Sequence, residues 1–157
     1  LVVQIDGRPH LLDPGYLILE PVPLDSGNET TIVTEFNELV LSPRAGGERL
    51  ELSTVAQGQR RSRLTFKTAP ADAGEFLHAW VASFDWDMMQ YPVLNRMRGG
   101  RQLYLQGNRF QQRDRESVQR EEIARDQLVA RISAEFGLDA NVVIRALEIL
   151  KRRGELA

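Results

Sequence analysis

The first part of the chain alternates apolar and polar positions in short runs that are separated by turn residues. Two such runs, residues 1–5 and 8–13, flank the pair Asp6-Gly7. Asp-Gly between alternating runs is typical of a two-residue β-hairpin turn. Further strand-like runs follow at residues 17–20, 31–36, 38–41, 50–55 and 63–66. The pattern predicts an antiparallel sheet that curls into a β-barrel-like lobe over residues 1–67.

After residue 67 the apolar positions change from a period of two to helical spacing. Between residues 70 and 84 they predict a helix with one apolar stripe that faces a core. The stripe consists of Phe76, Leu77, Trp80, Val81 and Phe84. The glycine-containing turns at 99–100 and 107–108 predict a three-stranded meander over residues 91–113.

Two helices are predicted at the end of the chain, over residues 120–137 and 139–154. Gly137 suits the left-handed position that ends a helix, and Asp139 suits an N-cap. The fold class predicted from these patterns is α+β. The β-barrel-like lobe would be followed by a small α/β lobe over residues 68–157, which would act as a lid.

Composition narrows the possible functions. Of the 157 residues, 42% are hydrophobic and 27% are charged, with a net charge of −2, which is typical of a soluble globular protein. This charge gives no reason to expect nucleic acid or a membrane as a partner. The chain has no cysteine and only two histidines, His10 and His78, so we expect no disulfide, no cysteine nucleophile and no metal site within it. No apolar run approaches the roughly twenty residues of a membrane span, and we expect a cytoplasmic protein.

The chain begins at Leu1, inside a strand-like run and without an initiator methionine. This start is how a fragment of a longer protein would begin. We therefore expect a missing N-terminal segment to be a partner of this chain.

Asp13 ends the opening hairpin, and Pro14-Gly15 follows it directly. An aspartate in this position is often a turn residue that accepts hydrogen bonds from the backbone. Alternatively, a carboxylate at a strand end can orient a histidine on the neighbouring strand by fixing its tautomer. Both interpretations fit the residues themselves.

The hairpin turn sets the pairing of the two strands and therefore the position of Asp13. The expected pairs are Ile5 with Arg8, Val3 with His10, and Leu1 with Leu12. Asp13 would then lie opposite the residue that precedes Leu1. His10 cannot be its partner, because residues 10 and 13 point to opposite faces of a strand.

The segment LVVQIDGRPHLLDPGY, residues 1–16, resembles the arylamine N-acetyltransferases and, more distantly, the transglutaminase-like cysteine enzymes. In these families a catalytic histidine precedes a strand, and the returning strand ends in a catalytic aspartate. The acetyltransferase pattern is Asp-x-Gly-Phe-Gly: Asp13 and Gly15 match it, Tyr16 is a near match, and Leu17 replaces the second glycine. Residues 95–110 and 128–143 are similar to the hairpin and the closing helix of the third domain of the acetyltransferases.

The resemblance implies acyl transfer from acetyl-CoA or another acyl-CoA to a small-molecule amine through a Cys-His-Asp triad. The cysteine and the histidine would lie before Leu1, the histidine within the three preceding positions, so this chain alone is predicted to be inactive. Asp13 is the catalytic candidate, and Gly15 and Tyr16 are candidates for substrate binding. No metal is implied.

Arginines between residues 95 and 115 are candidates for binding the phosphates of the co-substrate, and Arg98 and Arg101 are assigned this role. The alternative is that their stems cover apolar strand surface.

Two alternatives to the enzyme remain open. Residues 121–157 resemble a winged helix-turn-helix DNA-binding module, although Val142 and Val143 lie where polar, base-reading side chains belong. The chain could also belong to a non-catalytic scaffold protein with the acetyltransferase fold.

Overall fold

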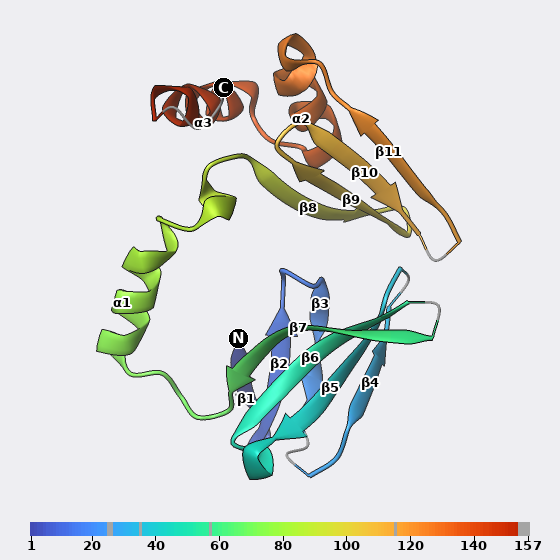
Figure 1. The fold of residues 1–157 in the computed structure, drawn as a ribbon, viewed down its shortest axis with the longest axis vertical. Helices are drawn as coiled ribbons and strands as arrows, with labels where there is room; N and C mark the ends of the chain where they lie inside the picture. The colour runs from blue at the N-terminus through green and yellow to red at the C-terminus, as the bar shows by residue number, and fades with distance from the viewer. Residues whose placement is uncertain (25–26, 35, 57, 115, 154–157) are drawn as a thin grey trace. The chain divides into compact units, whose positions relative to one another are not determined.

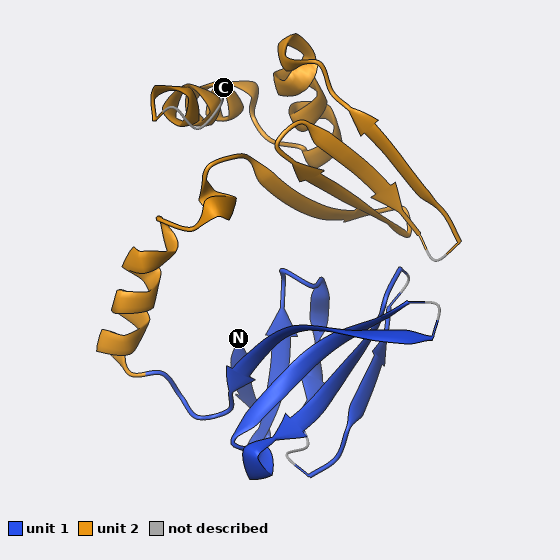
Figure 2. Cartoon of the chain, in the orientation of Figure 1, with its two compact units in different colours: residues 1–71 blue, residues 72–157 orange. Residues whose placement is uncertain are grey.

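The computed structural model describes residues 1–24, 27–34, 36–56, 58–114 and 116–153. The chain forms two compact units, Leu1–Ala71 and Asp72–Ala157 (Figure 2). Antiparallel sheets occur in both units, and the α-helices lie in the second unit (Figure 1). The predicted α+β class is confirmed.

The first sheet of unit 1 has the order β1-β2-β3. Its strands are β1 (Val2–Ile5), β2 (Arg8–Asp13) and β3 (Ile18–Pro23). Asp6 and Gly7 have φ angles of 50° and 72°, as expected for a two-residue turn with two left-handed positions. The predicted hairpin at the start of the chain is therefore confirmed.

The register of this hairpin is also the predicted one. The observed pairs are Ile5 with Arg8 and Val3 with His10. The backbone N–H of Leu12 donates to Leu1 O at 2.9 Å, and the amino group of Leu1 donates to Leu12 O at 3.0 Å. Asp13 therefore lies one position beyond the pair that Leu1 forms.

The second sheet of unit 1 has the order β4-β5-β6-β7. Its strands are β4 (Thr30–Val33), β5 (Glu38–Arg44), β6 (Arg49–Ala56) and β7 (Gln59–Lys67), and the short η1 (Ala45–Gly47) joins β5 to β6. The predicted run at 31–36 includes position 35, which lies outside the described residues.

The two sheets of unit 1 share one hydrophobic core, which contains Leu11, Ile18, Leu39, Leu41 and Leu52. In the described residues no sheet closes on itself, so the expected barrel-like lobe is not confirmed. The sequence alternation indicates which face of each strand is buried, but it does not determine whether edge strands pair with each other.

Unit 2 begins with helix α1 (Ala73–Ser83) and the short η2 (Asp87–Met89). The side chain of Asp72 caps α1 by accepting a hydrogen bond from the N–H of Glu75 at 2.9 Å. The predicted helix is therefore present, but the expectation that its stripe faces a core is wrong. None of its residues is buried, and Phe76, Leu77 and Trp80 are 61%, 60% and 55% exposed. Helical spacing reveals an apolar stripe but not the surface that covers it.

The sheet of unit 2 has the order β11-β10-β9-β8. Its strands are β8 (Val93–Arg98), β9 (Arg101–Gln106), β10 (Arg109–Arg113) and β11 (Val118–Glu122). The predicted three-stranded meander therefore has a fourth strand, where residues 120–122 were expected to begin a helix. Pairing of β11 with β10 prevails over the local helix preference of residues such as Glu121 and Arg120.

The two closing helices pack on this sheet. After η3 (Arg125–Gln127) they are α2 (Leu128–Phe136) and α3 (Ala140–Arg152). Their common core contains Leu103, Leu105, Phe110, Leu128, Ile132 and Val143. Gly137 ends α2 with a φ of 72°, and the side chain of Asp139 accepts from the N–H groups of Asn141 and Val142 at the start of α3, as predicted.

Away from the core of unit 1, an ion pair joins Glu29 to Arg60. Arg60 donates to both carboxylate oxygens of Glu29, at 2.6 and 2.8 Å, and the hydroxyl of Ser42 donates to Oε2 at 2.8 Å. These hydrogen bonds, that from Arg60 above all, lower the pKa of Glu29 from 4.5 to about 2. The pair links the residue just before β4 to β7.

The lowered pKa of Glu29 predicts a specific loss of stability in acid. Because the folded state holds the carboxylate ionised, its contribution is present above pH 4.5 and disappears as the pH falls towards about 2. Between these values, the free energy of unfolding should decline less steeply in Glu29→Gln than in the wild type. Urea denaturation at a series of pH values measures this slope. Glu20→Gln, which removes an exposed charge on β3, is the control, and equal slopes in the wild type and Glu29→Gln would contradict the prediction.

Candidate active site

Asp13 stands at the end of β2, where the pairing with β3 becomes irregular. Leu11 pairs with Val22 and Asp13 pairs with Ile18, with a shift of register between them. Leu11 is 2% exposed and belongs to the core, and Asp13, two positions further on, is partly buried. The irregularity lets the chain leave the sheet at Asp13, and such irregular pairing often occurs beside functional sites.

One oxygen of Asp13 holds the turn that follows. Oδ1 accepts hydrogen bonds from the backbone N–H groups of Gly15 at 2.9 Å and Tyr16 at 3.2 Å. The N–H of Leu17 donates to the carbonyl of Pro14 at 3.2 Å, which closes the turn. Among the described residues, no donor forms a hydrogen bond with Oδ2. Through Oδ1, Asp13 therefore acts as a turn residue.

Gly15 permits the close approach of this carboxylate. A Cβ atom at position 15 would lie 3.1 Å from Oδ1 of Asp13, closer than ordinary van der Waals contact. A side chain here would push the carboxylate away from the N–H groups that it accepts from. Steric crowding therefore explains why the Asp-x-Gly pattern has a glycine at position 15 of this structure.

Tyr16 packs against the core of unit 1 and is partly buried. Burial raises the pKa of its phenol; the charge of Asp13 also raises it, while that of Arg63 lowers it. The phenol is therefore neutral at physiological pH, and its backbone N–H contacts the carboxylate of Asp13.

Leu17 departs from the acetyltransferase pattern and has a φ of 57°. A left-handed backbone costs a residue with a side chain on the order of 1–2 kcal/mol, whereas glycine adopts it freely. Leu17 thus adopts a backbone conformation that suits glycine better, and this lowers the stability of the folded chain.

Arg63 is close to this turn, and sequence reasoning did not single it out. Leu64 pairs with Leu52 and Ser62 with Ser53, which leaves Arg63 unpaired in a β-bulge of β7. Its Nε donates to Oγ1 of Thr54 at 2.8 Å. Nothing in the sequence marks the bulge, because the arginine lies in an ordinary strand-like run.

The proposed phosphate ligands lie in unit 2, on either side of the β8–β9 turn. Arg98 Nη1 is 3.3 Å from Oε2 of Glu135, and Arg101 Nε is 3.4 Å from Oδ2 of Asp114. Both arginine side chains are more than half exposed, and such pairs contribute little to stability. Phosphate binding by Arg98 and Arg101 stays a prediction, in which a phosphate would compete with these carboxylates.

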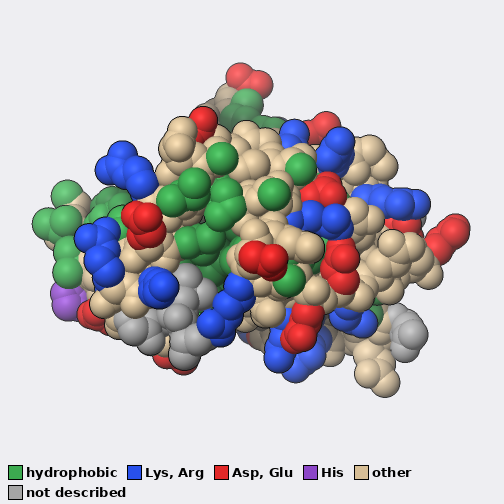
Figure 3. All heavy atoms as spheres, turned by 90° about the horizontal axis from the view of Figure 1, so that it is seen from above, with side chains coloured by type: hydrophobic (Ala, Val, Ile, Leu, Met, Phe, Trp, Pro, Cys, Tyr) green, Lys and Arg blue, Asp and Glu red, His purple; other side chains and the backbone are tan. Residues whose placement is uncertain are grey.

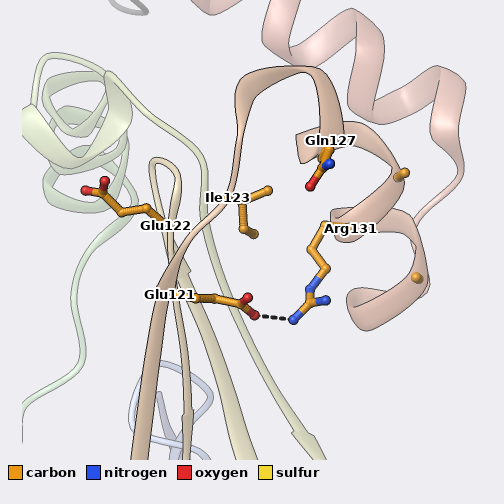
Figure 4. A pocket seen from close by; sticks show the side chains of 7 residues that line it. Glu121, Glu122, Ile123, Gln127 and Arg131 are labelled. Carbon is orange, nitrogen blue, oxygen red and sulfur yellow. Dashed lines mark hydrogen bonds and ion pairs between the residues drawn. The ribbon is translucent and has the colours of Figure 1, made fainter.

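A pocket of unit 2 lies between β11 and α2 (Figure 4). Arg131 forms an ion pair with Glu121 across it, whereas Glu122, the other charged residue of its lining, pairs with Arg109. Arg131 also lies over the ring of Phe110, at 4.9 Å from its centroid. None of the residues predicted from the sequence lines this pocket.

The described residues contain no cluster of three or more histidine, cysteine, aspartate or glutamate side chains that could hold a metal ion. Among them there is also no helix with the length and hydropathy that crossing a membrane requires.

The structure buries part of the helix that a DNA-binding module would use to read bases. Val143, in the helix that would read bases, is 4% exposed and packs with Ile132. Glu121 and Glu122 belong to β11. The wing of such a module would begin at residues 151–156, of which 154–156 lie outside the described residues.

The fold is that of the arylamine N-acetyltransferases. No family model matches the sequence, and no curated protein matches it. Solved structures match instead: the Mycobacterium smegmatis enzyme, as a cysteine-to-glutamine variant, has a TM-score of 0.73 at 17% identity, over 90% of this chain and 54% of its own. The Salmonella typhimurium enzyme has a TM-score of 0.72 at 13% identity, over 94% of this chain and 59% of its own.

The Mycobacterium marinum enzyme has a TM-score of 0.73 at 17% identity, over 99% of this chain and 56% of its own, and has also been solved in complex with CoA. The predicted resemblance is thus confirmed in the fold. This chain spans a little over half the length of these proteins.

The turn at Asp13 predicts different effects of two substitutions on the stability of the chain. Asp13→Ala removes the acceptor of two backbone N–H groups and should lower the free energy of unfolding by roughly 1–2 kcal/mol. Asp13→Asn keeps an oxygen acceptor and should cost less than about half of that. Urea denaturation of the 157-residue chain compares them. Equal losses would show that the two hydrogen bonds do not stabilise the turn.

Proposed function

We propose that this chain is part of an enzyme that transfers an acyl group from acyl-CoA to an amine, and that Asp13 orients its catalytic histidine. The observation that carries the proposal is the register of the opening hairpin. Since Leu1 pairs with Leu12, the residue before Leu1 in the complete protein would lie opposite Asp13. Oδ1 is fixed by the turn, and Oδ2 can accept the N–H of an imidazole on that strand.

The fold likeness supports the class of reaction. The three matched proteins are arylamine N-acetyltransferases, and this chain corresponds to between 54% and 59% of their length. We infer that a preceding segment supplies the nucleophilic cysteine and the histidine that the proposed reaction needs. The complex of the Mycobacterium marinum protein with CoA supports an acyl-CoA as the acyl donor.

In the proposed reaction Asp13 accepts a hydrogen bond from Nδ1–H of the imidazole, so that Nε2 faces the thiol. The imidazole takes the thiol proton, and the thiolate attacks the carbonyl carbon of the thioester. The C–S bond to CoA breaks, and the CoA thiolate leaves with the proton from the imidazolium. An amine then attacks the acyl-cysteine, and its proton passes through the imidazole to the departing cysteine sulfur. Asp13 stays ionised and stabilises the imidazolium in both halves.

Other residues have secondary parts in this proposal. Tyr16, neutral and next to Asp13, would border the acceptor pocket, and Gly15 keeps the turn compact. Arg98 and Arg101 would attract the phosphates of CoA in exchange for their present carboxylate partners.

Acylation of the complete protein by an acyl-CoA, followed by intact mass, tests the proposal. Asp13→Asn should slow formation of the acyl-enzyme by on the order of 10⁴-fold, because an amide no longer fixes the imidazole tautomer. Asp6→Asn makes the same change at the turn of the same hairpin and should leave the rate unchanged. Undiminished acylation in Asp13→Asn would refute the role of Asp13. A wild-type protein that never becomes acylated would favour the non-catalytic scaffold.

A further inference from the structure

The strongest unexplained feature of the chain is the apolar stripe of α1, which consists of Phe76, Leu77, Trp80, Val81 and Phe84. These side chains are between 44% and 61% exposed. The rings of Phe76 and Trp80 stack at 6.2 Å, and that of Phe84 meets Trp80 edge-on at 5.6 Å, so the aromatic surface is continuous. Hydrophobic side chains lie open on the face of the molecule drawn in Figure 3. Contiguous apolar surface of this kind marks an interaction site.

The length of α1 also indicates a missing contact. It has 11 residues, none of them buried. Isolated helices shorter than about 12–15 residues are marginal in water, and most helices in proteins depend on the packing of an apolar face. A partner that covers the stripe would supply that packing.

The charges around the stripe disfavour a second copy of the same face. Residues 68–95 contain the acids Asp72, Glu75, Asp85 and Asp87 and no lysine or arginine. Two such faces packed together would place like charges next to each other, which disfavours the pairing. The same charges disfavour an anionic membrane surface and favour an apolar partner with basic residues at its rim.

The length of the matched proteins supports a partner within the same polypeptide. The Mycobacterium marinum match covers 99% of this chain and therefore includes α1, yet a little under half of that protein lies outside the match. We propose that the polypeptide preceding Leu1 in the complete protein docks on the α1 stripe. The inference rests on the proposed function for the existence of that segment, and it adds where the segment binds and what its contact surface must contain.

Hydrogen exchange of the complete protein, read by mass spectrometry of its peptides, tests the docking. The amides of residues 73–84 should exchange at least 100-fold more slowly than in an unfolded peptide, because a covered helix is protected. Val81→Asp places a charge in the stripe and should reduce this protection at least tenfold, with a parallel loss in peptides of the preceding segment. Ala82→Asp adds the same charge next to it, on the opposite side of the helix, and should change protection less than twofold. If Val81→Asp prevents folding, Leu77→Ala with the control Ala79→Ser repeats the comparison without a new charge.

Three results would overturn the proposal: rapid exchange of α1 in the complete protein, protection that disappears on dilution of a dimer, or equal effects of Val81→Asp and Ala82→Asp. Asp13→Asn separates this inference from the proposed function, since it should slow acylation on the order of 10⁴-fold and leave the protection of α1 intact. A protein that is acylated although α1 is open contradicts only the docking. A protein with a protected α1 that is never acylated contradicts only the proposed chemistry.

Discussion

The account depends on two hydrogen bonds, from the backbone N–H groups of Gly15 and Tyr16 to Oδ1 of Asp13. They fix the carboxylate at the point where β2 leaves its sheet, and they occupy one of its two oxygens. A carboxylate held in this way has little freedom to rotate, so the direction in which Oδ2 can accept a hydrogen bond is set by the fold. Such rigidity is what an orienting group in a triad requires. The structural and the catalytic interpretations of Asp13 are thus compatible.

The start of the chain was predictable because its signals are local. The Asp6-Gly7 turn determines the register of the hairpin, and a helix end such as Gly137 follows from one residue with a positive φ. Features that depend on distant partners were not predictable. β11 forms because β10 offers it an edge, whereas its own residues favour a helix. The exposure of α1 shows the same limit, since the stripe identifies a helix but not its cover.

The candidate site was predicted only in part for the same reason. Asp13, Gly15 and Tyr16 come together in one turn because they are neighbours in sequence. Arg63 reaches that region through a bulge in a strand about fifty positions further along, which no local pattern announces. Phosphate binding by the arginines of the β8–β9 hairpin stays a prediction. Arg96 and Arg98 contact Glu135 at the end of α2, through its carbonyl and its carboxylate, and these contacts join segments that are distant in sequence.

One proposal accounts for both the proposed partner of Asp13 and the exposed stripe of α1: further polypeptide belongs to this fold. One measurement tests its centre most directly: the distance from Oδ2 of Asp13 to the nearest imidazole nitrogen in a crystal structure of the complete protein. The account predicts a histidine from the strand preceding Leu1 at about 2.7–3.0 Å. A carboxylate that contacts only Gly15 and Tyr16, with no imidazole within reach, would contradict it.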